Sequence, residues 1–98
     1  MRRPSLQAII EITAIRCIRA KSHEQISDVM WRTDTSQGQT SGQAIIDWLS
    51  ANSDNHAVVA IGSVYVPVLV VRPLNQPAYL RAQIDGVWTD YLLSLPTF

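Results

Sequence analysis

The 98-residue sequence has one cysteine, few charged side chains and no long apolar run. Because Cys17 has no second thiol within the chain, an intrachain disulfide is excluded. Charged residues make up 16%, below the usual quarter, and such a neutral surface favours a patch that another protein covers. The most apolar run, residues 64–71, is interrupted by Pro67 and falls short of the roughly 20 residues that a membrane helix needs. We therefore expect a cytoplasmic globular protein without membrane association.

The sequence also lacks a recognisable set of catalytic groups or metal ligands. His23 falls in a predicted turn and His56 at the start of an apolar hairpin, and no further ligands accompany either histidine at metal-binding spacing. Asp54 lies close to His56, but no serine follows the pattern of a nucleophile elbow. Residues 38–42 precede a helix and could bind an anion, but they lack the lysine and the spacing of a phosphate-binding loop. We expect no enzymatic activity, no cofactor and no metal.

The net charge of zero hides an uneven distribution. The first 32 residues carry six of the eight basic side chains and three acidic ones, so this third is +3 and the remainder is −3. Clustered positive charge binds phosphate by displacing counterions, so this part of the chain could support weak nucleic-acid binding. A solvated strand face explains the same charges and is the simpler interpretation.

Periodicity and turn signals divide the chain into strands and one main helix. Strand-like segments are rich in β-branched and aromatic residues and are bounded by turn signals. They cover residues 11–20, 26–33, 57–61, 64–71 and 78–84. A helix is predicted over residues 41–51, where apolar side chains recur at helical spacing. The whole chain then forms one α+β domain, a small antiparallel sheet of about five strands in the order strand-strand-helix-strand-strand-strand, with the helix on one face and a short C-terminal turn.

Local signals refine this outline. Thr40 and Gln43 fit a capping box at the start of the helix, each satisfying a main-chain amide of the other. Gly62 supplies the positive φ of a type II′ turn, which folds the apolar run of residues 57–72 into a hairpin. A β-bulge near residues 27–28 would restore the alternation of the second strand.

Other segments leave alternatives open. Residues 1–12 could form a short helix or an extended arm, and residues 34–41 have the composition of a loop. Pro67 cannot donate to a ladder, so its amide side must face an edge or a bulge. Both faces of the hairpin are apolar, and one helix covers only one of them. The second face must be covered by the N-terminal segment, by the leucine-rich residues 87–98 or by another molecule.

Several short motifs occur in a characteristic order. An Ile-Arg-Cys-Ile strand precedes a Trp-containing strand, a Thr-capped helix, an apolar hairpin and a terminal Leu-Leu-Ser-Leu-Pro. These motifs, over about residues 13–96, resemble DUF3892, a family of small bacterial proteins of unknown function. The matching residues are Ile15, Arg16, Cys17, Ile18, Ile26, Val29, Trp31, Thr40, Ala44, Ile45, Trp48, Leu49, Tyr79, Leu80, Asp85, Asp90, Leu92, Leu93, Ser94, Leu95 and Pro96. The family tail usually has Asn after its Asp, where this chain has Tyr91, so any role of that Asn is absent here. The resemblance implies a compact α+β domain and no particular activity.

Seven aromatic and basic side chains are candidate interaction residues. Trp and Tyr anchor interfaces more often than other residues, and aromatic residues beside Arg on a sheet can stack bases. The candidates are Trp31, Tyr65, Tyr79, Trp88, Arg16, Arg19 and Arg81. We expect a protein-protein interaction module, an adaptor or inhibitor of a larger bacterial or phage assembly, that acts through an apolar sheet face or edge as a homodimer or with another protein. The alternative is a weak nucleic-acid-binding accessory domain that uses the Arg and aromatic residues of the N-terminal hairpin.

Overall fold

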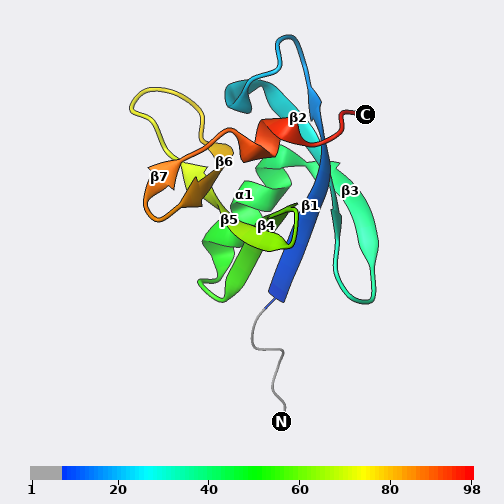
Figure 1. Ribbon diagram of the computed structural model, residues 1–98. Coiled ribbons are helices and arrows are strands. Elements are labelled where there is room, and N and C mark those ends of the chain that lie inside the picture. The colour runs from blue at the N-terminus through cyan, green and yellow to red at the C-terminus, as the bar shows by residue number, and fades with distance from the viewer. Residues whose placement is uncertain (1–7) are drawn as a thin grey trace.

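The computed structural model describes residues 8–98, and within that range seven strands form one sheet in the order β3-β2-β1-β4-β5-β6-β7 (Figure 1). The elements are β1 (Ala8–Cys17), η1 (His23–Gln25), β2 (Ile26–Arg32), β3 (Gln37–Ser41), α1 (Gly42–Ala51), β4 (Asn55–Ile61), β5 (Val64–Val71), β6 (Tyr79–Ile84), β7 (Val87–Trp88) and η2 (Tyr91–Ser94). The α+β class, the main helix and the short C-terminal turn are confirmed. The C-terminal turn is the 3-10 helix η2.

The expected five-stranded antiparallel sheet is wrong in strand number and in one pairing. β1 runs parallel to β4, with Glu11 opposite Val58, whereas the other neighbouring strands are antiparallel. The two added strands are β3 and β7. The parallel pair arises because β2, β3 and α1 together form a crossover that returns β4 to the free side of β1.

The first strand lies three residues closer to the N-terminus than predicted. Because β1 begins at Ala8, residues 8–12 are extended, and a helix over residues 1–12 is wrong for that part; residues 1–7 lie outside the described residues. The pairing of β1 with β2 shifts at Ser27, which has no partner in the ladder, so the predicted bulge is confirmed.

Residues 34–41 were expected to be a loop, but β3 occupies the last five of them. β3 pairs with β2 along its whole length, with Gly38 opposite Trp31. The Trp31 ring packs closely on Gly38, since a Cβ built there would lie 2.7 Å from the Cζ2 atom of the ring. Main-chain pairing and this contact replace the apolar alternation that normally marks a strand in sequence.

The capping box was assigned one residue too early. Ser41 is the N-cap of α1, and its Oγ accepts a hydrogen bond from the main-chain N–H of Ala44 at 3.0 Å. Thr40 is still paired with β2, and the side chain of Gln43 donates to Asp47 at 2.9 Å. The helix therefore begins only after β3 has finished its pairing.

The central hairpin is confirmed, with Gly62 at φ 62° in its turn. A two-residue turn makes its flanking pair, Ile61 and Val64, hydrogen-bonded, so alternation along the ladder makes Val58 and Pro67 a non-hydrogen-bonded pair. The nitrogen of Pro67 thus points away from β4. On that side the ladder with β6 begins only at the next residue, Val68. Pro67 therefore marks the end of the β5–β6 ladder, as its missing N–H requires.

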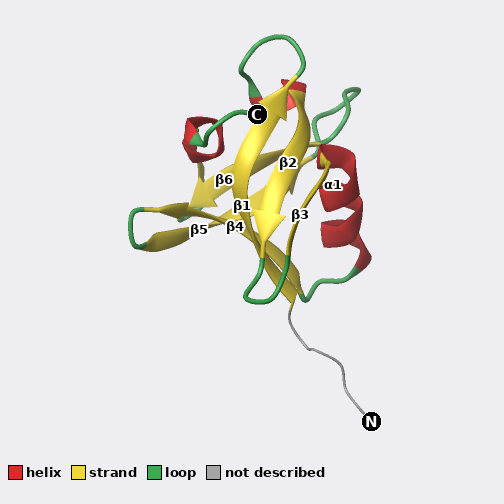
Figure 2. Cartoon of the chain, turned by 90° about the vertical axis from the view of Figure 1, so that its right-hand side faces the viewer, coloured by secondary structure: helices red, strands yellow, loops and turns green. Residues whose placement is uncertain are grey.

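A single core lies inside the curved sheet and is covered from two sides. In Figure 2, α1 and η2 lie on opposite sides of the strands. Both contribute fully packed side chains to the same apolar cluster: Ile45 and Ile46 from α1 are each 5% exposed, and Leu92 from η2 is 0% exposed. Leu92 of the leucine-rich C-terminal segment therefore packs into the core.

The chain end lies beside β1. The N–H of Ile15 donates to the carbonyl of Pro96 at 3.0 Å, and the N–H of Phe98 donates to the carbonyl of Ile15 at 3.1 Å. Thr97 forms a parallel bridge with Ile15, at a point where β1 no longer pairs with β4. The last residues thus extend the sheet along the upper part of β1.

Candidate functional site

The side of the β4–β5 hairpin opposite the core is apolar and exposed. Along both strands, buried valine and alanine side chains alternate with side chains that point away from the core. Among the latter, Tyr65 is 64% exposed and Leu69 is 40% exposed. The register places Ile9 of β1 on the same side. We name this surface the outer face; it consists of Ile9, His56, Val58, Tyr65, Pro67 and Leu69. Within residues 8–98, the second apolar face predicted for the hairpin therefore stays uncovered.

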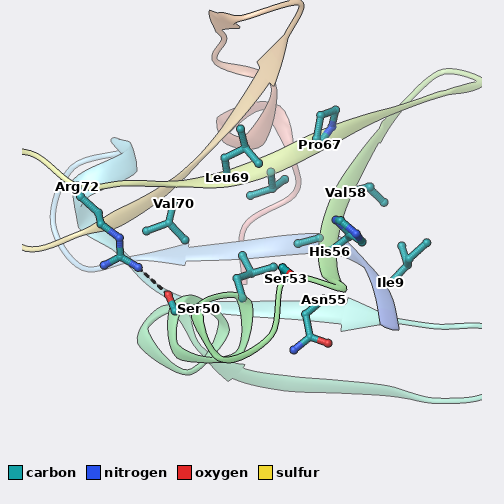
Figure 3. Close-up of a pocket in the computed structure, with 13 residues that line it drawn as sticks. Ile9, Ser50, Ser53, Asn55, His56, Val58, Pro67, Leu69, Val70 and Arg72 are labelled. Atoms are coloured by element: carbon teal, nitrogen blue, oxygen red, sulfur yellow. Dashed lines mark hydrogen bonds between the residues drawn. The ribbon is translucent and has the colours of Figure 1, made fainter. Parts of the chain in front are cut away.

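A groove opens where β4 and β5 separate. Their pairing ends at Ala57 and Val68, although β4 begins at Asn55 and β5 continues to Val71. Beyond that point β4 pairs with β1 and β5 pairs with β6, so the two strands diverge. The groove has a volume of about 550 Å³, and Figure 3 shows the side chains around it. It is lined by Ile9, Leu49, Ser50, Ser53, Asn55, His56, Ala57, Val58, Pro67, Val68, Leu69, Val70 and Arg72.

Arg72 is the only Lys, Arg, Asp or Glu side chain among the lining residues. Its Nη2 donates to Ser50 Oγ at 2.6 Å (Figure 3), and that hydroxyl donates to the carbonyl of Ile46 at 2.8 Å. Within residues 8–98, no carboxylate lies at ion-pair distance from the Arg72 guanidinium. The groove thus combines apolar walls with one cation that α1 holds in place.

The seven predicted interaction residues are distributed over several elements. Arg16 lies on β1, Arg19 in the loop before η1, Trp31 on β2, Tyr65 on β5, Tyr79 and Arg81 on β6, and Trp88 on β7. Of these residues, Tyr65 belongs to the outer face, and Arg81 lies next to it, because the register places Arg81 opposite Leu69. The structure does not gather the seven side chains into one site. The remaining outer-face residues and Arg72 were not selected, although the alternation of β5 already showed its second apolar face.

Three arginines that contributed to the predicted positive charge or base-stacking site are held by other groups. Arg16 donates from Nε to the carbonyl of Phe98 at 3.0 Å, and its guanidinium lies 4.7 Å from the centroid of the Phe98 ring. Arg81 donates from Nε to the carbonyl of Thr89 and from Nη2 to Asp90 Oδ1, both at 3.0 Å. Arg32 is the third and pairs with an acidic side chain.

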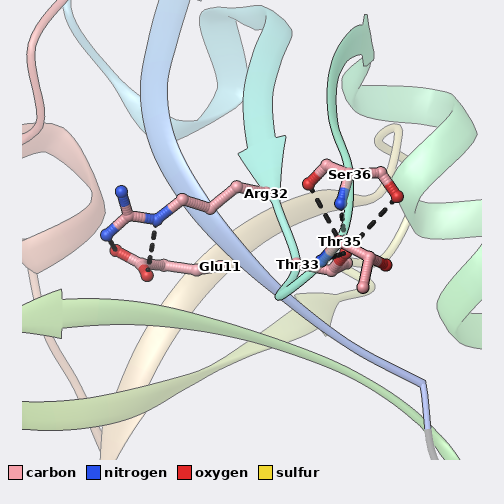
Figure 4. A network of polar contacts seen from close by, with 5 residues as sticks. All are labelled: Glu11, Arg32, Thr33, Thr35 and Ser36. Carbon is pink, nitrogen blue, oxygen red and sulfur yellow. Dashed lines mark hydrogen bonds and ion pairs between the residues drawn. The ribbon is translucent and has the colours of Figure 1, made fainter.

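Figure 4 shows the surroundings of that third arginine. Arg32 donates from Nε to Oε1 of Glu11 at 3.1 Å and from Nη2 to Oε2 at 3.4 Å. In the adjacent turn, Thr33 Oγ1 accepts hydrogen bonds from the main-chain N–H groups of Thr35 and Ser36 at 3.3 and 3.1 Å. The turn contacts fix the β2–β3 connection, and the ion pair engages one of the basic side chains of the N-terminal third.

His23 is buried rather than exposed in a turn, with 6% of its surface accessible. Its ring stacks on Tyr79 with 6.4 Å between ring centroids, and Nε2 has no hydrogen-bond partner among the described residues. Burial, and secondly the positive charge of Arg81, lower the pKa of His23, while Asp90 and Glu24 oppose that shift. The neutral imidazole is therefore the form that fits this position.

Within residues 8–98, no group of three or more His, Cys, Asp or Glu side chains is placed to hold a metal ion. None of the helices described is long and apolar enough to cross a membrane.

Comparison with known proteins identifies a family. No curated protein and no solved structure matches the chain. A family model described as "Protein of unknown function (DUF3892)" matches residues 11–96, which include all the motifs that carried the resemblance. The chain therefore belongs to the DUF3892 family.

Proposed function

We propose that this protein is a non-enzymatic interaction module that binds another protein, or a second copy of itself, through the outer face. The observation that supports the proposal is the exposure of Tyr65 and Leu69, at 64% and 40%, on an apolar surface beside a groove. Large exposed aromatic and aliphatic side chains that cluster on one surface favour a protein partner. As part of the same proposal, the partner is a component of a larger bacterial or phage assembly in the cytoplasm.

The structure favours the face over the edge of the hairpin as the contact surface. Beyond the β6 ladder, β5 has a free edge over residues 64–67, but Pro67 points its nitrogen toward that side and offers no donor. Strand addition at this edge would therefore lack a hydrogen bond. The outer face has no such obstacle.

The test compares Tyr65→Ser with the matched control Ile18→Ser. Ile18 is 68% exposed and Tyr65 64% exposed, but Ile18 follows the C-terminal end of β1 and is not part of the outer face. Light scattering over a range of concentrations measures self-association. Affinity capture from bacterial lysate measures binding of other proteins. We expect the wild type and Ile18→Ser to bind the same partner, itself or another protein, and Tyr65→Ser to lose it. A strictly monomeric wild type that captures nothing, or a partner retained by Tyr65→Ser, would contradict the proposal.

Nucleic-acid binding is the weaker alternative. Arg16 and Arg81 would have to contact phosphate, yet each already binds a group of its own chain. Arg19 and Lys21 remain without an ion pair within residues 8–98. Mobility shift of single-stranded DNA at about 50 and 200 mM salt separates the two functions, because phosphate contacts produce a steep loss of affinity with salt. A shift at low salt that disappears at high salt would favour this alternative.

A further inference from the structure

We propose that the groove between β4 and β5 binds an extended apolar peptide that presents a carboxylate to Arg72. This inference rests on the proposed function and specifies the chemistry of the partner. The volume of about 550 Å³ falls within the range of ligand sites in proteins. Its walls come from three strands and α1, and the strands contribute Ile9 from β1, Val58 from β4, and Pro67 and Leu69 from β5. Side chains of this kind select apolar groups.

The charge of the groove selects the polar end of the peptide. Arg72 is the only Lys, Arg, Asp or Glu of the lining, and no carboxylate of residues 8–98 lies at ion-pair distance from it. Its hydrogen bond to Ser50 uses one donor, and the guanidinium has further N–H groups to offer a ligand. A carboxylate is the complementary group because it accepts two such bonds in a fixed geometry. The carboxylate of a peptide C-terminus or of an acidic side chain meets this requirement.

The main chain of β5 selects a peptide over a lipid. Because Val68 is a hydrogen-bonded partner of Ala57, alternation turns the N–H and carbonyl of Val70 toward the same side, where β4 has already diverged. An extended peptide that enters the groove can pair with these groups, as in other cases of strand addition. A fatty-acid chain would leave them without partners.

The experiment is a nuclear magnetic resonance titration of the ¹⁵N-labelled protein with acetyl-Ser-Val-Leu-Val, used either with a free carboxylate or as its C-terminal amide. We expect the acid to shift the amide signals of Ser50, Val70 and Arg72. The amide form should bind about tenfold more weakly, because a hydrogen bond to a charged group is lost. Arg72→Gln should reduce the affinity for the acid to that for the amide and leave the amide form unaffected. Arg19→Gln, an exposed arginine outside the groove, is the control and should bind like the wild type.

Other outcomes would overturn the inference. Equal binding of acid and amide would remove the role of Arg72, and binding without a shift at Val70 would remove the main-chain pairing. A parallel titration with decanoate tests a lipid occupant; if decanoate binds through Arg72 and the peptide does not, the peptide is excluded. The two proposals can fail separately, because Tyr65 does not line the groove. If Tyr65→Ser loses the protein partner but the wild type does not bind the peptide, the proposed function stands and only this inference is refuted.

Discussion

His23 is the first residue of η1, and its imidazole packs toward β6, with Tyr79 against its ring and the Arg81–Asp90 ion pair nearby. Its pKa in the folded protein lies below the ordinary value of 6.5, mainly because of burial. The unfolded chain therefore binds a proton at a higher pH than the folded chain does. The stability that His23 contributes is fully present above pH 6.5 and is lost as the pH falls from 6.5 through its lowered pKa.

We predict that replacing His23 by Gln removes this part of the pH dependence. Urea denaturation at pH values from about 8 to 5 should show a loss of stability in the wild type that is larger than in His23→Gln, since glutamine does not titrate. His56→Gln, the same substitution at an exposed histidine, is the matched control for the chemical change itself. If stability changed with pH by the same amount in the wild type and in His23→Gln, His23 would bind protons equally well in the folded and unfolded states.

Single-residue roles were the least accessible part of the site from sequence. The partner of Arg16 is Phe98, 82 positions away, so no local pattern indicates that this arginine is engaged. Arg81 and Asp90 are nine positions apart and meet only because the β6–β7 hairpin turns between them. Arg72, in contrast, ends the most apolar run of the chain, and its place beside apolar side chains could have been noted. Its position in a groove depends on the divergence of β4 and β5, which the sequence does not show.

At the level of elements, the segments with strong periodicity were predicted well, and the polar ones were not. The hairpin of β4 and β5 follows directly from two valine-rich runs around Gly62. β3 has no apolar alternation, since its sequence is QGQTS, and its partner is β2 rather than the core. What makes it a strand is main-chain pairing together with the space that Gly38 leaves for Trp31.

Substitution of Gly38 by Ala tests this account of β3. A methyl group on Gly38 would lie 2.7 Å from the Trp31 ring, and that ring also packs against the core. Alanine favours a strand over glycine by about 0.5–1 kcal/mol, but overpacking of this kind costs about 1–3 kcal/mol. We therefore predict a net destabilisation of about 1–2 kcal/mol in urea denaturation. Gln39→Ala, an exposed neighbour on β3, should change stability by less than about 0.5 kcal/mol. A Gly38→Ala protein as stable as Gln39→Ala would show that moving Trp31 aside costs no more than alanine gains in the strand.

At the level of the whole molecule, the sequence indicates the local hairpins that contribute to the core but not how these hairpins pair with each other in one sheet. Local hairpins could be predicted, because a turn fixes which strands pair. The parallel pair of β1 and β4 is not adjacent in sequence, and no local signal marks it. This parallel pairing determines the sheet, because it joins β3, β2 and β1 to the four C-terminal strands. The curved sheet is then covered by both α1 and η2, and the outer face stays exposed within residues 8–98.

The contribution of η2 to this arrangement can be measured at Leu92. Its side chain is 0% exposed and belongs to the same apolar cluster as Ile45 and Ile46 of α1. Leu92→Ala should therefore lower the free energy of unfolding by about 2–5 kcal/mol, the usual cost of such a cavity. Leu74→Ala is the control, since Leu74 is 88% exposed in the loop before β6, and it should be nearly neutral. If the two variants were equally stable, η2 would be a surface turn, and the core would be closed by α1 alone. A large loss in Leu92→Ala alone would instead show that the C-terminal segment is as much a part of the fold as the main helix.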